Sequence, residues 1–135
     1  MTWLLDGNVL VAMAFRDHIH RGRCLRWFGT LAPDDIFATC PVTEGTLLRL
    51  HMQRAVELSA IAAWQALERY RAHPRHVFWP DNFSYTEIAP GRLTGHRQVT
   101  ESWLAELARR KGGKLATLDT GLAVLWPESV MLVPV

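Results

Sequence analysis

The clearest structural signal in the chain is the stretch Thr2-Trp3-Leu4-Leu5-Asp6-Gly7-Asn8-Val9-Leu10-Val11. Its first apolar run is too short for a helix and ends at Asp6, and a second apolar run, residues 9–15, follows Gly7 and Asn8. We interpret it as a buried strand, a tight turn at Gly7 and a helix that Asn8 caps. Asp6 then lies at the carboxyl end of a strand, the edge of a parallel sheet where ligands bind. Taken alone, Asp6 is better explained as a turn residue that accepts hydrogen bonds from its own backbone.

The same alternation of short apolar runs and helical patterns continues through the rest of the chain. Apolar and β-branched runs predict further strands at residues 36–40, 77–79, 114–118 and 130–133. Apolar positions at three- and four-residue spacing predict helices at residues 22–31, 41–52, 57–71, 99–111 and 120–126. Strand then helix, repeated from end to end, predicts an α/β fold: a three-layer α/β/α domain over residues 1–135, with a mostly parallel sheet of about five strands.

The composition excludes several classes of protein. The longest uninterrupted apolar stretch, residues 9–15, is far too short to cross a bilayer, and no basic region precedes the first apolar run. We therefore expect a soluble cytoplasmic protein with no membrane partner. Cys24 and Cys40 lack the spacing of a disulfide framework or a zinc site, and we expect both to be buried. Three tryptophans at helical spacing are assigned to packing: Trp27, Trp64 and Trp103.

The charge of the chain gives only a weak indication of its partners. A formal net charge of +2 is too small to indicate nucleic-acid binding by itself. All but two of the basic residues are arginine, whose planar fork suits phosphate better than the point charge of lysine.

Four acidic residues are predicted at one edge of the sheet. Asp6 and Asp119 end strands, whereas Glu44 and Glu101 begin helices, and in a parallel sheet these four places lie on the same side. Glu44 alone also fits a helix-start glutamate that serves only the helix dipole. A cluster of carboxylates repels itself, and a hard cation such as Mg²⁺ or Mn²⁺ relieves that repulsion. Such an ion activates a bound water and stabilises charge on a phosphate, so the implied chemistry is phosphodiester hydrolysis.

Three motifs carry a family resemblance: Leu4-Leu5-Asp6-Gly7-Asn8-Val9-Leu10, Gly95-His96-Arg97-Gln98-Val99-Thr100 before Glu101, and Leu115-Ala116-Thr117-Leu118-Asp119. Together with Glu44 after the second strand, they resemble the signature of PIN-domain ribonucleases, in particular the VapC-type toxins of bacterial toxin–antitoxin pairs. The resemblance covers essentially the whole chain, in order.

The resemblance implies an endoribonuclease that uses Mg²⁺ or Mn²⁺ and inhibits translation by cutting RNA. It implies that Asp6, Glu101 and Asp119 bind the metal, that Glu44 is a further active-site acid, and that Asn8 orients the site through hydrogen bonds. Relatives usually have aspartate where this chain has Glu101. The extra methylene moves that carboxylate outward by roughly a bond length and a half.

The resemblance also implies three partners: an RNA substrate, a VapB-type antitoxin that occludes the site, and a second copy of the chain in a homodimer. Arg16, His96 and Arg97 are predicted to contact RNA phosphates, which set affinity but carry no sequence information. For Arg21 and Arg23 a solvated helix face is an equally good explanation.

The sequence also allows two alternatives to a PIN-domain ribonuclease. One is a phosphotransferase in which Asp6 is a nucleophile. Haloacid dehalogenases, however, have a second aspartate where this chain has Asn8, and receiver domains need a lysine at the sheet edge, whereas Lys111 and Lys114 fall at the opposite end of a strand. The other is a catalytically weak PIN domain that binds RNA or protein, which the Glu101 substitution keeps open.

Overall fold

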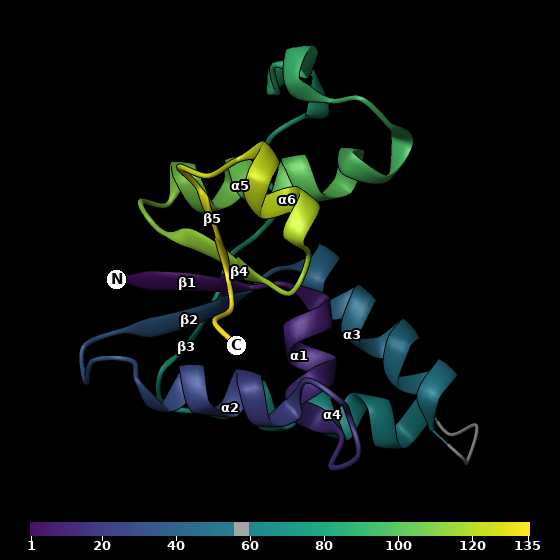
Figure 1. Ribbon diagram of the computed structural model, residues 1–135. Coiled ribbons are helices and arrows are strands. Elements are labelled where there is room, and N and C mark those ends of the chain that lie inside the picture. Colours follow the sequence, from purple (N-terminus) through teal and green to yellow (C-terminus); the bar gives the residue numbers. More distant parts are fainter. Residues whose placement is uncertain (56–59) are drawn as a thin grey trace.

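The structure is a computed structural model that describes residues 1–55 and 60–135. Its centre is a five-stranded sheet in the order β3-β2-β1-β4-β5 (Figure 1). Every neighbouring pair is parallel. The strands are β1 (Thr2–Leu5), β2 (Ile36–Thr39), β3 (His76–Phe78), β4 (Lys114–Thr117) and β5 (Val130–Leu132). The predicted α/β fold is confirmed, and the sheet is wholly parallel.

Helices cover both faces of the sheet. One face carries α1 (Gly7–Ala14), α2 (Arg21–Gly29), α3 (Pro41–Arg54) and α4 (Ala60–Arg71). The other carries α5 (Val99–Arg110) and α6 (Thr120–Leu125), which lie above the sheet in Figure 1. Between β3 and α5 the chain forms three short 3-10 turns, η1 (Tyr85–Glu87), η2 (Pro90–Arg92) and η3 (His96–Gln98). The first residues of the helix predicted at 57–71 lie outside the described residues.

Successive residues of the central strands feed the two halves of the core. Leu4 and Leu115 are fully buried against α5, and their neighbours Leu5 and Ala116 are fully buried on the side of α1. Burying each leucine contributes roughly 1.5–3 kcal/mol relative to leaving it in water. This explains the unbroken apolar runs of strands that are covered on both faces.

Among the three tryptophans assigned to packing, Trp27 and Trp103 are buried. Trp64 is 50% exposed, so that assignment is wrong. The apolar positions of α4 cover a wider arc than the helix buries, because only Ala63, Ala66 and Leu67 are inside. Cys24 and Cys40 are free and buried, as expected.

The turn after β1 differs from the prediction. Gly7 is already the first residue of α1, Asp6 occupies the N-cap position, and the side chain of Asn8 does not cap the helix. A Cβ atom built on Gly7 would lie 2.5 Å from the Cβ of Thr46, so close packing of α3 excludes a side chain here. The glycine that needs unusual dihedrals is instead Gly112, whose φ of 70° ends α5.

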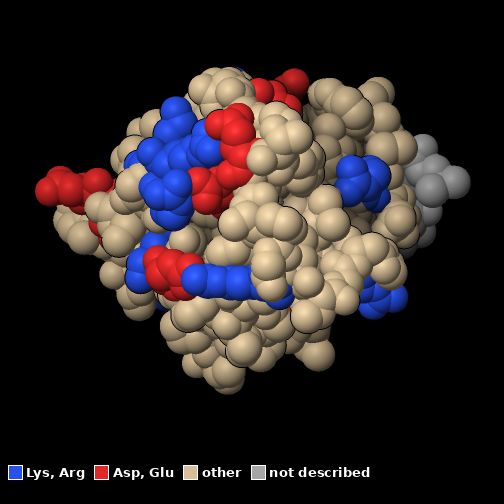
Figure 2. Space-filling view, turned by 90° about the horizontal axis from the view of Figure 1, so that it is seen from above, with Lys and Arg blue, Asp and Glu red and all other residues tan. Residues whose placement is uncertain are grey.

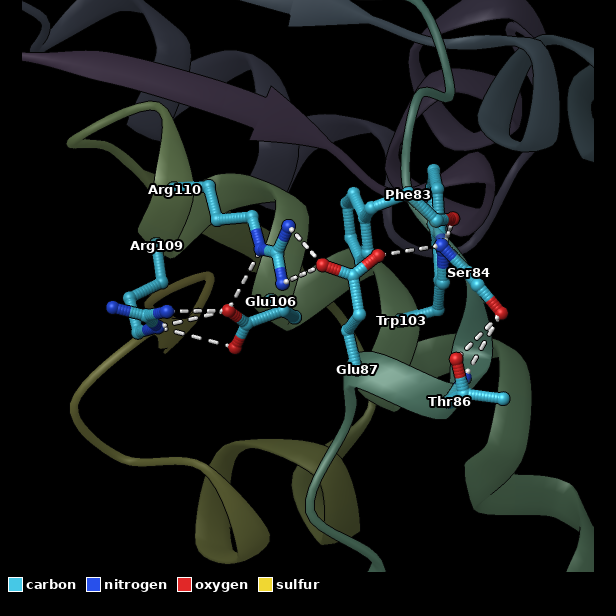
Figure 3. Close-up of polar contacts among 8 residues, drawn as sticks. All are labelled: Phe83, Ser84, Thr86, Glu87, Trp103, Glu106, Arg109 and Arg110. Atoms are coloured by element: carbon cyan, nitrogen blue, oxygen red, sulfur yellow. Dashed lines mark hydrogen bonds and ion pairs between the residues drawn. The ribbon is translucent and has the colours of Figure 1, made fainter.

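The segment before η1 is fastened to α5 by a mixed aromatic and ionic cluster (Figure 3). Phe83 stacks on Trp103 with 4.7 Å between ring centroids, and Trp103 Nε1 donates to the carbonyl of Phe83 at 3.2 Å. The guanidinium of Arg110 lies 4.0 Å from the Phe83 ring and pairs with both Glu87 and Glu106. These contacts anchor the chain that leads through η3 into the first turn of α5.

Among the described residues, no helix is both long and apolar enough to span a membrane.

Candidate active site

The hydroxyl of Thr117, the last residue of β4, is the centre of a hydrogen-bond network. It donates to Asp6 Oδ2 at 2.7 Å, and it accepts from Asn8 Nδ2 at 3.3 Å and from the backbone amide of Asp119 at 3.1 Å. Thr117 is fully buried. One buried oxygen therefore fixes three predicted site residues relative to each other. Nothing in the sequence marks Thr117 as a site residue, because a threonine in a strand is ordinary.

Asn8 and Asp119 form further hydrogen bonds at the ends of α1, β4 and α6. Asn8 Oδ1 accepts from the backbone amide of Leu118 at 3.2 Å, so its amide group spans from α1 to the end of β4. Asp119 is exposed and caps α6 through a 3.1 Å bond from the amide of Leu122 to Oδ1. The parallel register explains the meeting, because β1 pairs with β4 and both strands end at this edge.

Two of the predicted acids, Asp6 and Glu101, have raised pKa values. Burial raises the pKa of Asp6, hydrogen bonds from Thr117 and the Gly7 amide oppose that shift, and the charge of Asp119 adds to it. Burial also raises the pKa of Glu101, and the charges of Asp6 and Asp119 raise it further. Glu101 lies in the first turn of α5, as expected. The structure thus brings three of the four predicted acids into one electrostatic cluster.

Glu44 has hydrogen-bond partners of its own, Thr39 and Arg71. It is in the first turn of α3, and its Oε2 accepts from Thr39 Oγ1 at 2.7 Å and from Arg71 at 2.9 Å. Its charge contributes to neither of the raised pKa values described for Asp6 and Glu101. The salt bridge to Arg71, a residue of α4, was not anticipated from the sequence. The role of Glu44 as an active-site acid stays a prediction.

The three predicted RNA contacts are divided between two places. His96 and Arg97 are exposed in η3, directly before the helix that carries Glu101. Arg16 follows the far end of α1, a helix of eight residues and about 12 Å, so the structure does not bring it to the acids. Contact of these residues with RNA stays a prediction.

The surface over α5 and α6 carries charges of both signs. In Figure 2, which views the molecule from above Figure 1, blue basic atoms lie directly beside red acidic atoms. Ion pairs on this side of the molecule join Arg92 of η2 to Glu128 and Arg110 of α5 to Glu87 of η1. At long range the charges of these pairs largely cancel.

The acid cluster fits a hard divalent cation by its donors. Within residues 1–55 and 60–135, no basic side chain forms a salt bridge with Asp6, Glu101 or Asp119. Across the same residues, no three His, Cys, Asp or Glu side chains are already arranged to hold a metal ion. The uncompensated carboxylates supply the oxygen ligands that Mg²⁺ and Mn²⁺ prefer, with no thiolate or imidazole suited to zinc among them.

Comparison with known proteins identifies the family. The chain is 42% identical over 134 residues to ribonuclease VapC29 of Mycobacterium tuberculosis, covering 99% of this chain and 98% of that protein. This chain belongs to the VapC family of PIN-domain ribonuclease toxins. Ribonuclease VapC38 of the same organism is 40% identical over 125 residues, covering 90% of this VapC chain and 88% of its relative.

Solved structures support the fold assignment of this VapC chain. The crystal structure of VapC20 of M. tuberculosis, a sarcin–ricin loop cleaving toxin, matches with a TM-score of 0.72 at 17% identity, covering 98% of this chain and 99% of the other. VapBC2 of Rickettsia felis, bound to a DNA fragment from its promoter, matches with a TM-score of 0.67 at 15% identity, covering 97% and 98%. No family model matches the chain.

Proposed function

We propose that this VapC toxin cuts RNA with Mg²⁺ or Mn²⁺ bound by Asp6, Glu101 and Asp119, and that it inhibits translation in the cytoplasm. The observation that carries the proposal is that the buried hydroxyl of Thr117 joins Asp6 to the backbone of Asp119. The charges of these two carboxylates also raise the pKa of Glu101, and none of the three acids has a basic partner in the described part of the chain. When bound, such an ion lowers the pKa of a coordinated water and stabilises negative charge on the phosphate.

The residues around the acids position them for this task. The Thr117 hydroxyl holds one oxygen of Asp6, and Asn8 locks the start of α1 to the end of β4. Asp119 keeps one oxygen engaged in its helix cap. His96 and Arg97, just before α5, bind phosphates flanking the bond that is cut, with the arginine fork matching the phosphate oxygens.

The decisive experiment is RNA cleavage with Mg²⁺, with Mn²⁺ and with EDTA, for the parent chain, Glu101→Asp and Glu101→Gln. We expect the parent to cut only with metal, and Glu101→Gln to lose at least about tenfold in rate, because a metal-binding oxygen is lost. Cleavage by the parent that EDTA leaves unchanged contradicts the proposal. Cleavage by Glu101→Asp alone favours the alternative of a catalytically weak binding module, since the longer glutamate would then be the defect.

We further propose that an antitoxin of the VapB type docks at the cavity between α1, α2 and α4. This cavity of about 490 Å³ is lined by aromatic and apolar side chains together with Arg16, Arg21 and Arg69. No salt bridge involves these arginines among the described residues. Apolar walls and unpaired cations fit a segment that carries both apolar and acidic side chains.

The antitoxin proposal predicts a large effect of charge reversal. Arg16→Glu with Arg69→Glu is expected to weaken binding of a co-expressed VapB-type partner by at least about tenfold, measured by calorimetry. Arg26→Glu with Arg49→Glu is the matched control, because these exposed arginines do not line the cavity. Equal affinities of the two double variants would contradict the docking site.

The homodimer stays a proposal as well. Ile61 and Trp64 expose apolar surface on α4, which suits contact with a second copy. Light scattering of the purified chain tests the proposal, because a homodimer has twice the mass of the single chain.

A further inference from the structure

We propose that Arg71 binds a phosphate of the RNA substrate, and that Glu44 is the positioning residue that holds its guanidinium. The inference rests on the proposed ribonuclease function and deepens it. It gives Glu44 a task different from metal binding, and it adds a basic group that the sequence did not indicate.

The first observation is a directed chain of hydrogen bonds. Arg71 donates to Glu44 Oε2 at 2.9 Å, Thr39 Oγ1 donates to the same oxygen at 2.7 Å, and His76 Nε2 lies 2.7 Å from Thr39 Oγ1. Because the single hydrogen of the Thr39 hydroxyl goes to Glu44, His76 must donate through Nε2. Thr39 is fully buried, so the chain has a rigid base in the sheet.

The second observation is the state of Arg71 itself. Its guanidinium is held on one side by Glu44 and on another by the ring of Phe78, 4.8 Å away. The side chain remains 45% exposed, and one of its nitrogens serves the ion pair. A guanidinium has five donors in a planar fork, and within residues 1–55 and 60–135 Arg71 donates only to Glu44, so its remaining donors can meet an incoming anion. An arginine ordered in advance loses less entropy when it binds phosphate.

The third observation is the place of this group in the sheet. Phe78 ends β3 and Thr39 ends β2, so the guanidinium of Arg71 lies at the carboxyl edge that also carries Asp6. The first two turns of α3 connect the two sites, because Glu44 and Thr46 both belong to them and Thr46 packs on Gly7. Thr39 and Thr117 flank β1, and two strand spacings separate them by about 10 Å. A strand of RNA that lies over Asp6 along this edge therefore reaches Arg71.

The contacts of Glu44 also argue against metal binding by this residue. Its Oε2 already accepts two hydrogen bonds, and the adjacent guanidinium neutralises its charge. A second cation at the same carboxylate would be repelled by Arg71. Glu44 therefore differs from Asp6, Glu101 and Asp119, for which no basic partner is present among the described residues.

The test measures RNA binding by the full chain in EDTA. The affinity is obtained from the fluorescence anisotropy of a labelled single-stranded RNA of mixed sequence. A mixed sequence suffices because phosphate contacts are independent of sequence. We expect Arg71→Ala to weaken binding about tenfold and to reduce the slope of log affinity against log salt by about 0.7, the value for one phosphate on a single strand. Glu44→Ala removes the acceptor that holds Arg71, so it should also weaken binding, by a smaller factor than Arg71→Ala. Tighter binding, the result expected if the carboxylate only repels RNA, would contradict the positioning role.

The controls separate this inference from the proposed function. Arg26→Ala removes an exposed arginine from α2 and should leave the salt slope at the parental value. If Arg71→Ala does not fold, Arg71→Lys takes its place, because it keeps a positive charge beside Glu44. Arg71→Lys should bind RNA about threefold more weakly than the parent, since the planar fork of donors is lost. If the parent cuts RNA and Arg71→Ala matches Arg26→Ala in both affinity and slope, the inference is wrong. If the parent binds RNA without cutting it, the ribonuclease proposal fails and the Arg71 phosphate site stands. If the parent has no affinity for RNA, the ribonuclease proposal and the Arg71 site are both wrong.

Discussion

Asp6→Asn is expected to lower the rate of RNA cleavage by more than about 100-fold while leaving the fold intact. The substitution removes the most buried charge of the acid cluster and keeps an oxygen that can accept from Thr117. Because burial and Asp119 both raise the pKa of Asp6, its ionised form is unfavourable in the metal-free fold. The free energy of unfolding in EDTA should therefore equal that of the parent or exceed it by about 1 kcal/mol.

Two measurements check this result: initial rates with saturating Mg²⁺, and denaturant unfolding in EDTA. Asp34→Asn is the matched control, because Asp34 is exposed just ahead of β2 at the opposite edge of the sheet. It should cut RNA at the parental rate. If Asp6→Asn unfolds well below the parent, the carboxylate is structural; if it cuts normally, Asp6 is not a metal ligand.

The order of strands and helices could be predicted because it depends on local patterns. Strand β1 is an apolar run that stops at a carboxylate, and the helix predicted at residues 99–111 ends at Arg110, just ahead of Gly112. The convergence of Asp6 and Asp119 also follows from the sequence, since parallel strands end at one edge. The topology of the sheet is therefore enough to predict that Asp6 and Asp119 lie near each other.

The partner of Glu44 could not be predicted in this way. Arg71 is 27 residues away in the sequence, and its approach depends on how α4 packs against α3 and on the length of a flexible side chain. Thr117 was missed for a related reason. Its hydroxyl becomes a hub only when α1 brings Asn8 within 3.3 Å, a distance that no local pattern encodes. Side-chain contacts between elements depend on tertiary packing, whereas the ends of strands depend mainly on the local sequence.

Gly7→Ala is expected to destabilise the fold by about 1–3 kcal/mol and to reduce cleavage sharply, although alanine is ordinarily the better helix former. A methyl group at this position would lie 2.5 Å from the Cβ of Thr46, so α1 and α3 must move apart. The same residue links Asp6 to Asn8, and any shift of the backbone here pulls both from Thr117. Stability and catalysis should therefore fall together.

A double-mutant cycle shows whether the contact between α1 and α3 is the cause. Thr46→Gly alone should cost about 0.3–0.5 kcal/mol through helix propensity, but combined with Gly7→Ala it should recover stability and cleavage, with a coupling energy of about 1–2 kcal/mol. Gly29→Ala is the control, because nothing lies within 4 Å of a Cβ at that helical position, and it should be neutral or stabilising. If Gly7→Ala behaves like Gly29→Ala, the two helices yield without cost, and the tight approach of α3 does not position Asp6. If the double variant recovers stability without cleavage, the glycine acts on the site through the backbone of α1 and not through Thr46.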